Sequence, residues 1–142
     1  MIKRELNLRW EEIPDWLQKL VDRLRPHGFE DGLKKYNLSK VSTKPIGRSF
    51  TLESRHPWYE TILNYRAVGG DLTRIKDPAL QYMIDKLAMD SMKLETIIRD
   101  TRMPPSIERQ LMRRMVQLNE AYPALFEIEM AFHYWRMGGE LE

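Results

Sequence analysis

Apolar residues recur at intervals of three and four along most of this chain, and proline or glycine interrupts the pattern repeatedly. Such spacing places apolar side chains on one face of an α-helix, whereas a half-buried strand alternates at every second residue. Proline and glycine commonly mark helix boundaries. The sequence therefore predicts an all-α fold, with about five helices in a small bundle. At 142 residues the chain has the usual length of one domain, 1–142.

Five segments carry the helical pattern clearly, and we expect each to form a main helix of the bundle. They are about 9–24, 58–68, 78–100, 105–119 and 122–137. The third should begin at Asp77 and Pro78, because aspartate caps helix N-termini and proline is accepted at the first helical position. We predict only a short helical piece at about 29–36.

Between about 37 and 56 the helical pattern fails, and Pro45, Gly47 and Pro57 punctuate the chain. We interpret 37–56 as an irregular connector with room for a short hairpin. The stretch from 33 to 52 is also basic and contains no carboxylate. Its five cations are Lys34, Lys35, Lys40, Lys44 and Arg48. Tyr36 and Phe50 lie among them, and a basic segment with aromatic rings suits contacts to phosphates and exposed bases.

A second group of cations, Arg109, Arg113 and Arg114, falls within one and a half turns of a predicted helix. Together the two groups support the hypothesis of a nucleic-acid-binding accessory domain. Surface lysines and arginines are more often simply solvated, however, and the net charge of +2 is small for such a domain. Both interpretations of the cations remain open at this point.

Several kinds of chemistry are absent from the sequence. The chain has no cysteine, which excludes disulfides, thiol nucleophiles and zinc–thiolate sites. It contains no complete catalytic constellation, so the residues favour a protein that is not an enzyme and needs no metal or cofactor. His133 and Glu129 have a spacing that can hold a metal, but such pairs are more commonly surface polar groups. Without a signal peptide or a membrane-length apolar stretch, a cytoplasmic location is expected.

Methionine and aromatic residues suggest a different role. The chain has nine methionines, and methionine both fills core gaps and forms adaptable binding surfaces. Several lie in predicted helices that also carry Tyr82, Phe126 and Tyr134. Our leading hypothesis is therefore a non-catalytic helical protein-interaction module or a subunit of a larger assembly. Its partner would be another protein or a second copy of the chain; nucleic acid is the alternative, and no membrane is expected.

The segment from Phe126 to the C-terminus resembles the first helix and incoming strand of restriction-endonuclease-like (PD-(D/E)XK) nucleases. The family's helix glutamate, small residue, terminal glycine and apolar strand correspond here to Glu127, Ala131, Gly138 and Leu141. In those enzymes the glutamate can help to organise a magnesium site. The family's catalytic aspartate and acid-x-lysine would lie beyond Glu142. The resemblance therefore implies the N-terminal region of a longer nuclease-like protein, cut before its catalytic core.

Overall fold

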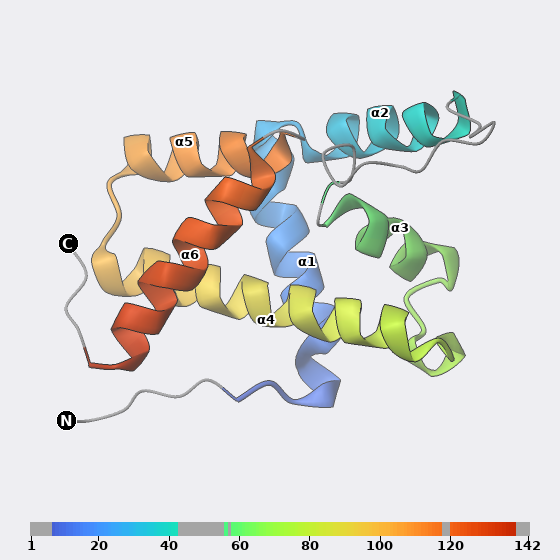
Figure 1. The fold of residues 1–142 in the computed structure, drawn as a ribbon, viewed down its shortest axis with the longest axis horizontal. Coiled ribbons are helices and arrows are strands. Elements are labelled where there is room, and N and C mark those ends of the chain that lie inside the picture. The colour runs from blue at the N-terminus through green and yellow to red at the C-terminus, as the bar shows by residue number, and fades with distance from the viewer. Residues whose placement is uncertain (1–6, 43–55, 57, 118–119, 139–142) are drawn as a thin grey trace.

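The computed structural model describes residues 7–42, 56, 58–117 and 120–138, and within these ranges the protein is all-helical, without strands (Figure 1). This confirms the predicted fold class. The α-helices are α1 (Ile13–Leu24), α2 (Phe29–Ser42), α3 (Tyr59–Ala67), α4 (Pro78–Thr101), α5 (Pro105–Val116) and α6 (Ala121–Arg136). Three short 3-10 turns are found among the described residues, η1 (Trp10–Glu12), η2 (Arg25–His27) and η4 (Leu72–Arg74). Among the helices described, none is long and apolar enough to cross a membrane.

The prediction of five main helices was wrong, because the described residues form six. The additional helix is α2, which includes the predicted short piece and continues through 37–42, where we expected an irregular connector. Three buried side chains of α2 lie on one helical face: Phe29, Leu33 and Tyr36. Packing of this face stabilises a helix whose last turns carry no apolar pattern. The remainder of the expected connector, 43–55, lies outside the described residues.

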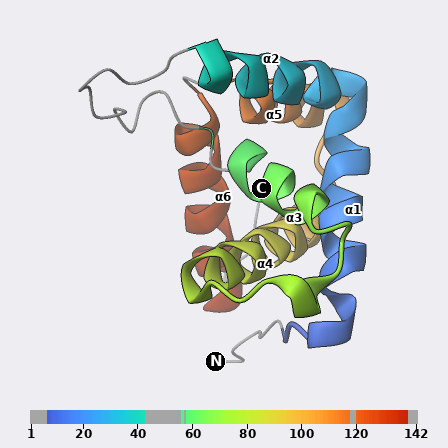
Figure 2. The ribbon, with the colours of Figure 1, turned by 90° about the vertical axis from the view of Figure 1, so that its right-hand side faces the viewer.

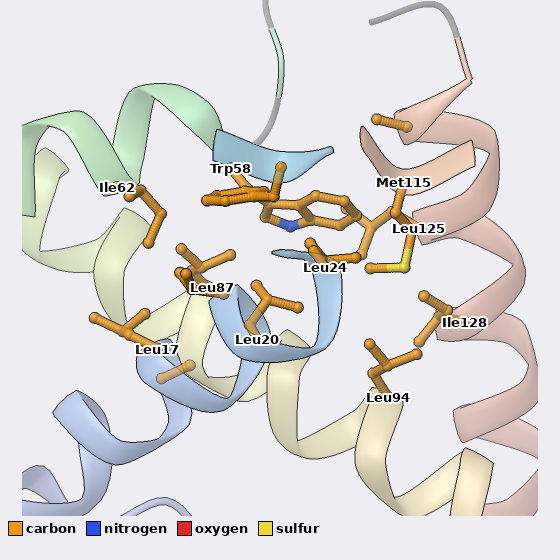
Figure 3. Close-up of a cluster of buried hydrophobic side chains, with 14 of the residues drawn as sticks. Leu17, Leu20, Leu24, Trp58, Ile62, Leu87, Leu94, Met115, Leu125 and Ile128 are labelled. Carbon is orange, nitrogen blue, oxygen red and sulfur yellow. The ribbon is translucent and has the colours of Figure 1, made fainter. Parts of the chain in front are cut away.

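The core is built around α1. Leu17, Leu20 and Leu24 recur at intervals of three and four, and each has at most 1% of its surface exposed. In Figure 3, α3 lies on one side of these leucines and α5 and α6 lie on the other, while α4 passes across both sides, with Leu87 near Ile62 and Leu94 near Ile128. The neighbouring side chains labelled there are Trp58, Ile62, Leu87, Leu94, Met115, Leu125 and Ile128. The core therefore draws on helices from both ends of the chain.

The helices that surround this core are arranged at its edges and faces. Figure 2 shows α1 and α6 on opposite sides of the molecule, with α3 and α4 between them. Both views place α2 and α5 along the upper edge. The last helix packs on α4 and α5 and runs obliquely across the front in Figure 1. One side of α6 therefore faces the core, and its opposite side faces away from the other helices.

Buried His56 shapes the beginning of α3. Its Nδ1 accepts hydrogen bonds from the backbone N–H groups of Trp58 and Tyr59 at 3.2 and 3.3 Å. With Nδ1 acting as acceptor, Nε2 carries the proton and donates to the Met115 carbonyl at 2.7 Å. The ring also stacks on Tyr59, with 3.7 Å between centroids. Histidine therefore caps α3 and connects it to α5, a structural role that the sequence did not reveal.

An ion-pair cluster connects α1, α4 and α5. Arg23 donates to Glu95 through Nε and Nη2 at 2.5 and 2.7 Å, and through Nη1 to Glu108. All three side chains are about a quarter exposed. Partial burial strengthens such an interaction relative to a fully solvated pair.

Replacing Arg23 with methionine should lower the free energy of unfolding by about 1–2 kcal/mol, because two carboxylates lose their common cation while most of the apolar stem is kept. Urea denaturation followed by circular dichroism measures this loss. The matched control is Arg25→Met: the Arg25–Asp22 pair is more than half exposed and should contribute less than about 0.5 kcal/mol. Equal losses in the two variants would contradict the assignment.

Candidate functional site

The last helix is apolar on two opposite faces. Its inner face is buried and consists of Ala121, Ala124, Leu125, Ile128, Phe132 and Trp135. Five large apolar residues on the other side are exposed, with 42–65% of their surface accessible: Tyr122, Phe126, Met130, Tyr134 and the following residue Met137. We call these five the α6 outer face. A surface helix normally exposes polar residues on the side away from the core, and the apolar α6 outer face departs from this pattern.

The α6 outer face is continuous because of its spacing. Tyr122, Phe126, Met130 and Tyr134 follow one another at steps of four, which places them in one inclined row along the helix surface. Each has between 44% and 65% of its surface exposed. The row therefore forms one ridge of large side chains along the length of α6.

Charges border this ridge on both flanks, and each of the two carboxylates there is paired. Glu127 accepts a hydrogen bond from Arg114 of α5 at 2.6 Å. Glu129 accepts from Lys93 of α4 at 2.9 Å. No residue of the α6 outer face is itself charged. Exposed His133 lies on the same side of the helix, three residues after Met130 and four before Met137. The five apolar side chains around it are suited to contact with an apolar surface.

A buried carboxyl lies where α6 crosses α4. Asp90 of α4 has 5% of its surface exposed, its Oδ2 lies 3.4 Å from Lys86 Nζ, and its Oδ1 has no hydrogen-bond partner among the described residues. Burial, assisted by the adjacent carboxylate of Glu129, raises the pKa of Asp90 to about 6. Although burial opposes it, the hydrogen bond from Lys93 lowers the pKa of Glu129. Asp90 therefore takes up a proton before Glu129 does as the pH falls.

This polar cluster was missed at the level of sequence. Asp90 falls within the apolar stripe of α4, between Leu87 and Leu94. A carboxylate in such a stripe is the sequence feature that could have indicated a buried polar cluster. The partner Glu129 comes from another helix, so sequence spacing could not reveal the pair.

The cations predicted to bind nucleic acid belong to two helices and to a segment outside the described residues. Lys34 and Lys35 are exposed on α2, and Arg109 and Arg113 are exposed on α5. The backbone of Lys40 belongs to α2; Lys44 and Arg48 lie outside the described residues. Arg114 is turned towards Glu127. The helices α2 and α5, which carry these cations, lie along the same upper edge (Figure 1), while Arg114 is engaged in an internal ion pair.

The residues that carry the nuclease resemblance lie at the end of the described chain. Glu127 pairs with Arg114, Ala131 is partly buried, and Gly138, two residues after the end of α6, has a positive φ of 86°. The strand position, Leu141, lies outside the described residues. Within the described part of the chain, no group of three or more acidic or histidine side chains is placed to hold a metal ion.

Comparison with protein-family models, with curated proteins and with solved structures found no match to this chain. The relationship to restriction-endonuclease-like nucleases therefore stays a prediction.

Proposed function

We propose that this chain is a non-catalytic protein-interaction module that docks through the α6 outer face. The observation that supports this proposal is the second apolar face of α6, where Phe126 has 65% of its surface exposed and Met130 has 54%. Large apolar patches on soluble domains commonly mark interaction sites. The rigid helical scaffold beneath the face presents it without further folding.

Binding of a partner to the α6 outer face would be favourable because it removes apolar surface from water. Each square ångström of apolar surface that a partner covers contributes roughly 25 cal/mol. Tyrosine and phenylalanine are effective interface residues, since they cover much area with few rotatable bonds. Methionine adds a flexible side chain that adapts to a partner's shape. The composition of the α6 outer face therefore suits a protein partner.

Site-specific photo-crosslinking in living cells tests this proposal. A photoreactive phenylalanine analogue at Met130 should give a defined crosslinked species, because the partner would cover that position. The same analogue at Leu38, which is 61% exposed on α2, is the matched control and should give none. The Met130 crosslink should also disappear when Phe126 is changed to glutamate. Absence of any Met130 species, or equal crosslinking from Leu38, would contradict docking through α6.

The second candidate function is nucleic-acid binding along the upper edge of the molecule. It is favoured by two helices that lie along that edge and carry exposed cations: Lys34 and Lys35 on α2, and Arg109 and Arg113 on α5. Acidic residues also occur there: Glu30 in the first turn of α2 pairs with Arg66. This mixture of charges is why we place the nucleic-acid hypothesis second.

A salt titration tests the nucleic-acid hypothesis. If these four cations contact phosphates, raising salt from about 50 to about 200 mM should weaken binding to labelled DNA or RNA by roughly 100-fold. Reversing all four charges to glutamate should abolish the remaining binding, whereas Phe126→Glu should leave it unchanged. Absence of binding at low salt would eliminate this function and leave the interaction module untouched.

A further inference from the structure

We propose further that the occupant of the α6 outer face is a second copy of this chain, which makes the protein a homodimer with its α6 helices paired. This inference rests on the proposed function, since it names the partner for the same face. Three properties of the face support it: its charge, the arrangement of its ridge, and its area.

The charge of the face permits self-association. Two copies of a surface with charges of one sign repel each other, whereas the five residues of the α6 outer face are uncharged and the exposed His133 among them is neutral at pH 7. The flanking carboxylates of Glu127 and Glu129 are already paired with Arg114 and Lys93 of the same chain. Approach of a second copy therefore brings together two apolar surfaces whose bordering carboxylates are neutralised.

The ridge is complementary to a copy of itself. In a symmetric dimer the same patch meets itself, so it must contain both the projections and the spaces that receive them. Rows of side chains at steps of four do this: the row of one helix packs into the grooves beside the same row of another, with the axes crossing at about −50°. Tyr122, Phe126, Met130 and Tyr134 form such a row on α6. Pairing of two α6 helices thus uses the commonest packing of helices in globular proteins.

The area of the face is adequate for a reversible dimer. Aromatic side chains present about 150–250 Å² each; with a similar area taken for the two methionines, the three aromatic residues and two methionines at 42–65% exposure offer at most on the order of 500 Å² per copy. Two copies together would cover about 1,000 Å², which is near the lower limit for a specific interface. We therefore expect a dimer that dissociates on dilution.

Sedimentation equilibrium of the purified full chain tests the dimer, over about a hundredfold range of concentration so that mass action shifts the population. The wild type should change from monomer to dimer as concentration rises. Phe126→Glu places a charge in the middle of the ridge and should raise the dissociation constant at least about tenfold, as a desolvated unpaired charge does in an interface. Leu38→Glu introduces the same charge at an exposed leucine of α2 and should leave the constant unchanged. Far-UV circular dichroism establishes that both variants remain helical.

Each outcome decides between the two proposals. A chain that is monomeric at every concentration, or a dimer that is indifferent to Phe126→Glu, would overturn the inference of paired α6 helices. If the chain is monomeric but Met130 crosslinks to a different protein, the interaction module stands and only self-association is lost. If the chain is monomeric and Met130 gives no crosslink, both proposals fail.

Discussion

Replacing His56 with alanine is expected to lower the free energy of unfolding by about 3 kcal/mol at pH 7. The variant loses an acceptor for two N–H groups at the start of α3, a donor to the Met115 carbonyl, and the stack on Tyr59. Those groups are buried, so water would satisfy them poorly. Few other single side chains in the described structure combine a helix cap with a contact between helices.

The loss caused by this substitution should shrink as the pH falls. Burial lowers the pKa of His56 from 6.5 to about 4, although the hydrogen bond to Met115 opposes the shift. Between these two values the unfolded chain binds the proton and the folded chain does not, so acid favours unfolding of the wild type. The stabilising contribution of neutral His56 is complete above pH 6.5 and falls by about 3 kcal/mol towards pH 4. The alanine variant lacks this titration.

Urea denaturation at pH 7, 5.5 and 4 measures the difference between the wild type and His56→Ala. A matched control is His56→Asn, whose side-chain oxygen can accept the α3 N–H bonds but does not titrate. The asparagine variant should exceed the alanine variant by about 1 kcal/mol at every pH. A wild-type advantage that stays constant from pH 7 to pH 4 would contradict a neutral, capping His56.

The Asp90→Asn substitution is expected to act in the opposite direction and raise the free energy of unfolding by about 2 kcal/mol at pH 7. The wild-type carboxyl is buried and its Oδ1 lacks a hydrogen-bond partner among the described residues. Asparagine has nearly the same shape, needs no desolvation of a charge, and can donate a hydrogen bond to Glu129. The loss of Lys86 as a partner costs little, because the Lys86 side chain is 46% exposed.

The pH dependence of the stability difference between the wild type and Asp90→Asn is a sharper test than a measurement at pH 7 alone. The pKa of Asp90 is raised from 3.8 to about 6, so between these values the folded chain binds the proton before the unfolded chain does. The titration of Asp90 therefore destabilises the wild type above pH 6, and this cost disappears as the pH falls towards 4. The advantage of Asp90→Asn should disappear over the same range. The control is Asp22→Asn, at a carboxylate that is 54% exposed, which should change stability by less than about 0.5 kcal/mol.

A destabilised Asp90→Asn variant at pH 7 would mean that the charged carboxylate contributes more through Lys86 than its burial costs. In the wild type, His56 and Asp90 titrate over nearly the same pH range with opposite effects on stability. Their contributions largely cancel, so a pH profile of the wild type alone would reveal neither. The difference between the wild type and His56→Ala isolates the titration of His56, because both proteins retain Asp90. The difference between the wild type and Asp90→Asn isolates the titration of Asp90 in the same way.

Local sequence signals located most helix boundaries. Asp77 and Pro78 marked the start of α4, and the aspartate does cap the helix by accepting from the Ala79 N–H at 3.0 Å. The apolar stripe of α1 correctly predicted a helix with one buried face. These features depend on residues close together in the chain, where spacing and backbone chemistry are sufficient.

The extent of α2 could not be predicted in this way. Its buried face is stabilised by packing against α3, where the rings of Phe29 and Tyr36 lie 5.3 and 5.6 Å from that of Tyr59. An added Cβ at Gly32 would lie 2.1 Å from the Tyr59 hydroxyl, so the glycine allows this close approach. The first part of α2, 29–36, is thus stabilised by a residue more than 20 positions away, and the helix continues from it into 37–42, where the local pattern predicted a connector.

The sequence by itself determined that this protein is helical and where most of its helices begin and end. Only the tertiary structure decided which charges are engaged internally, such as Arg114 with Glu127 and Lys93 with Glu129. It also decided which apolar face of α6 is buried. Because α6 is apolar on both faces, its local pattern fits either orientation, and only packing against α4 and α5 selects the face that remains exposed.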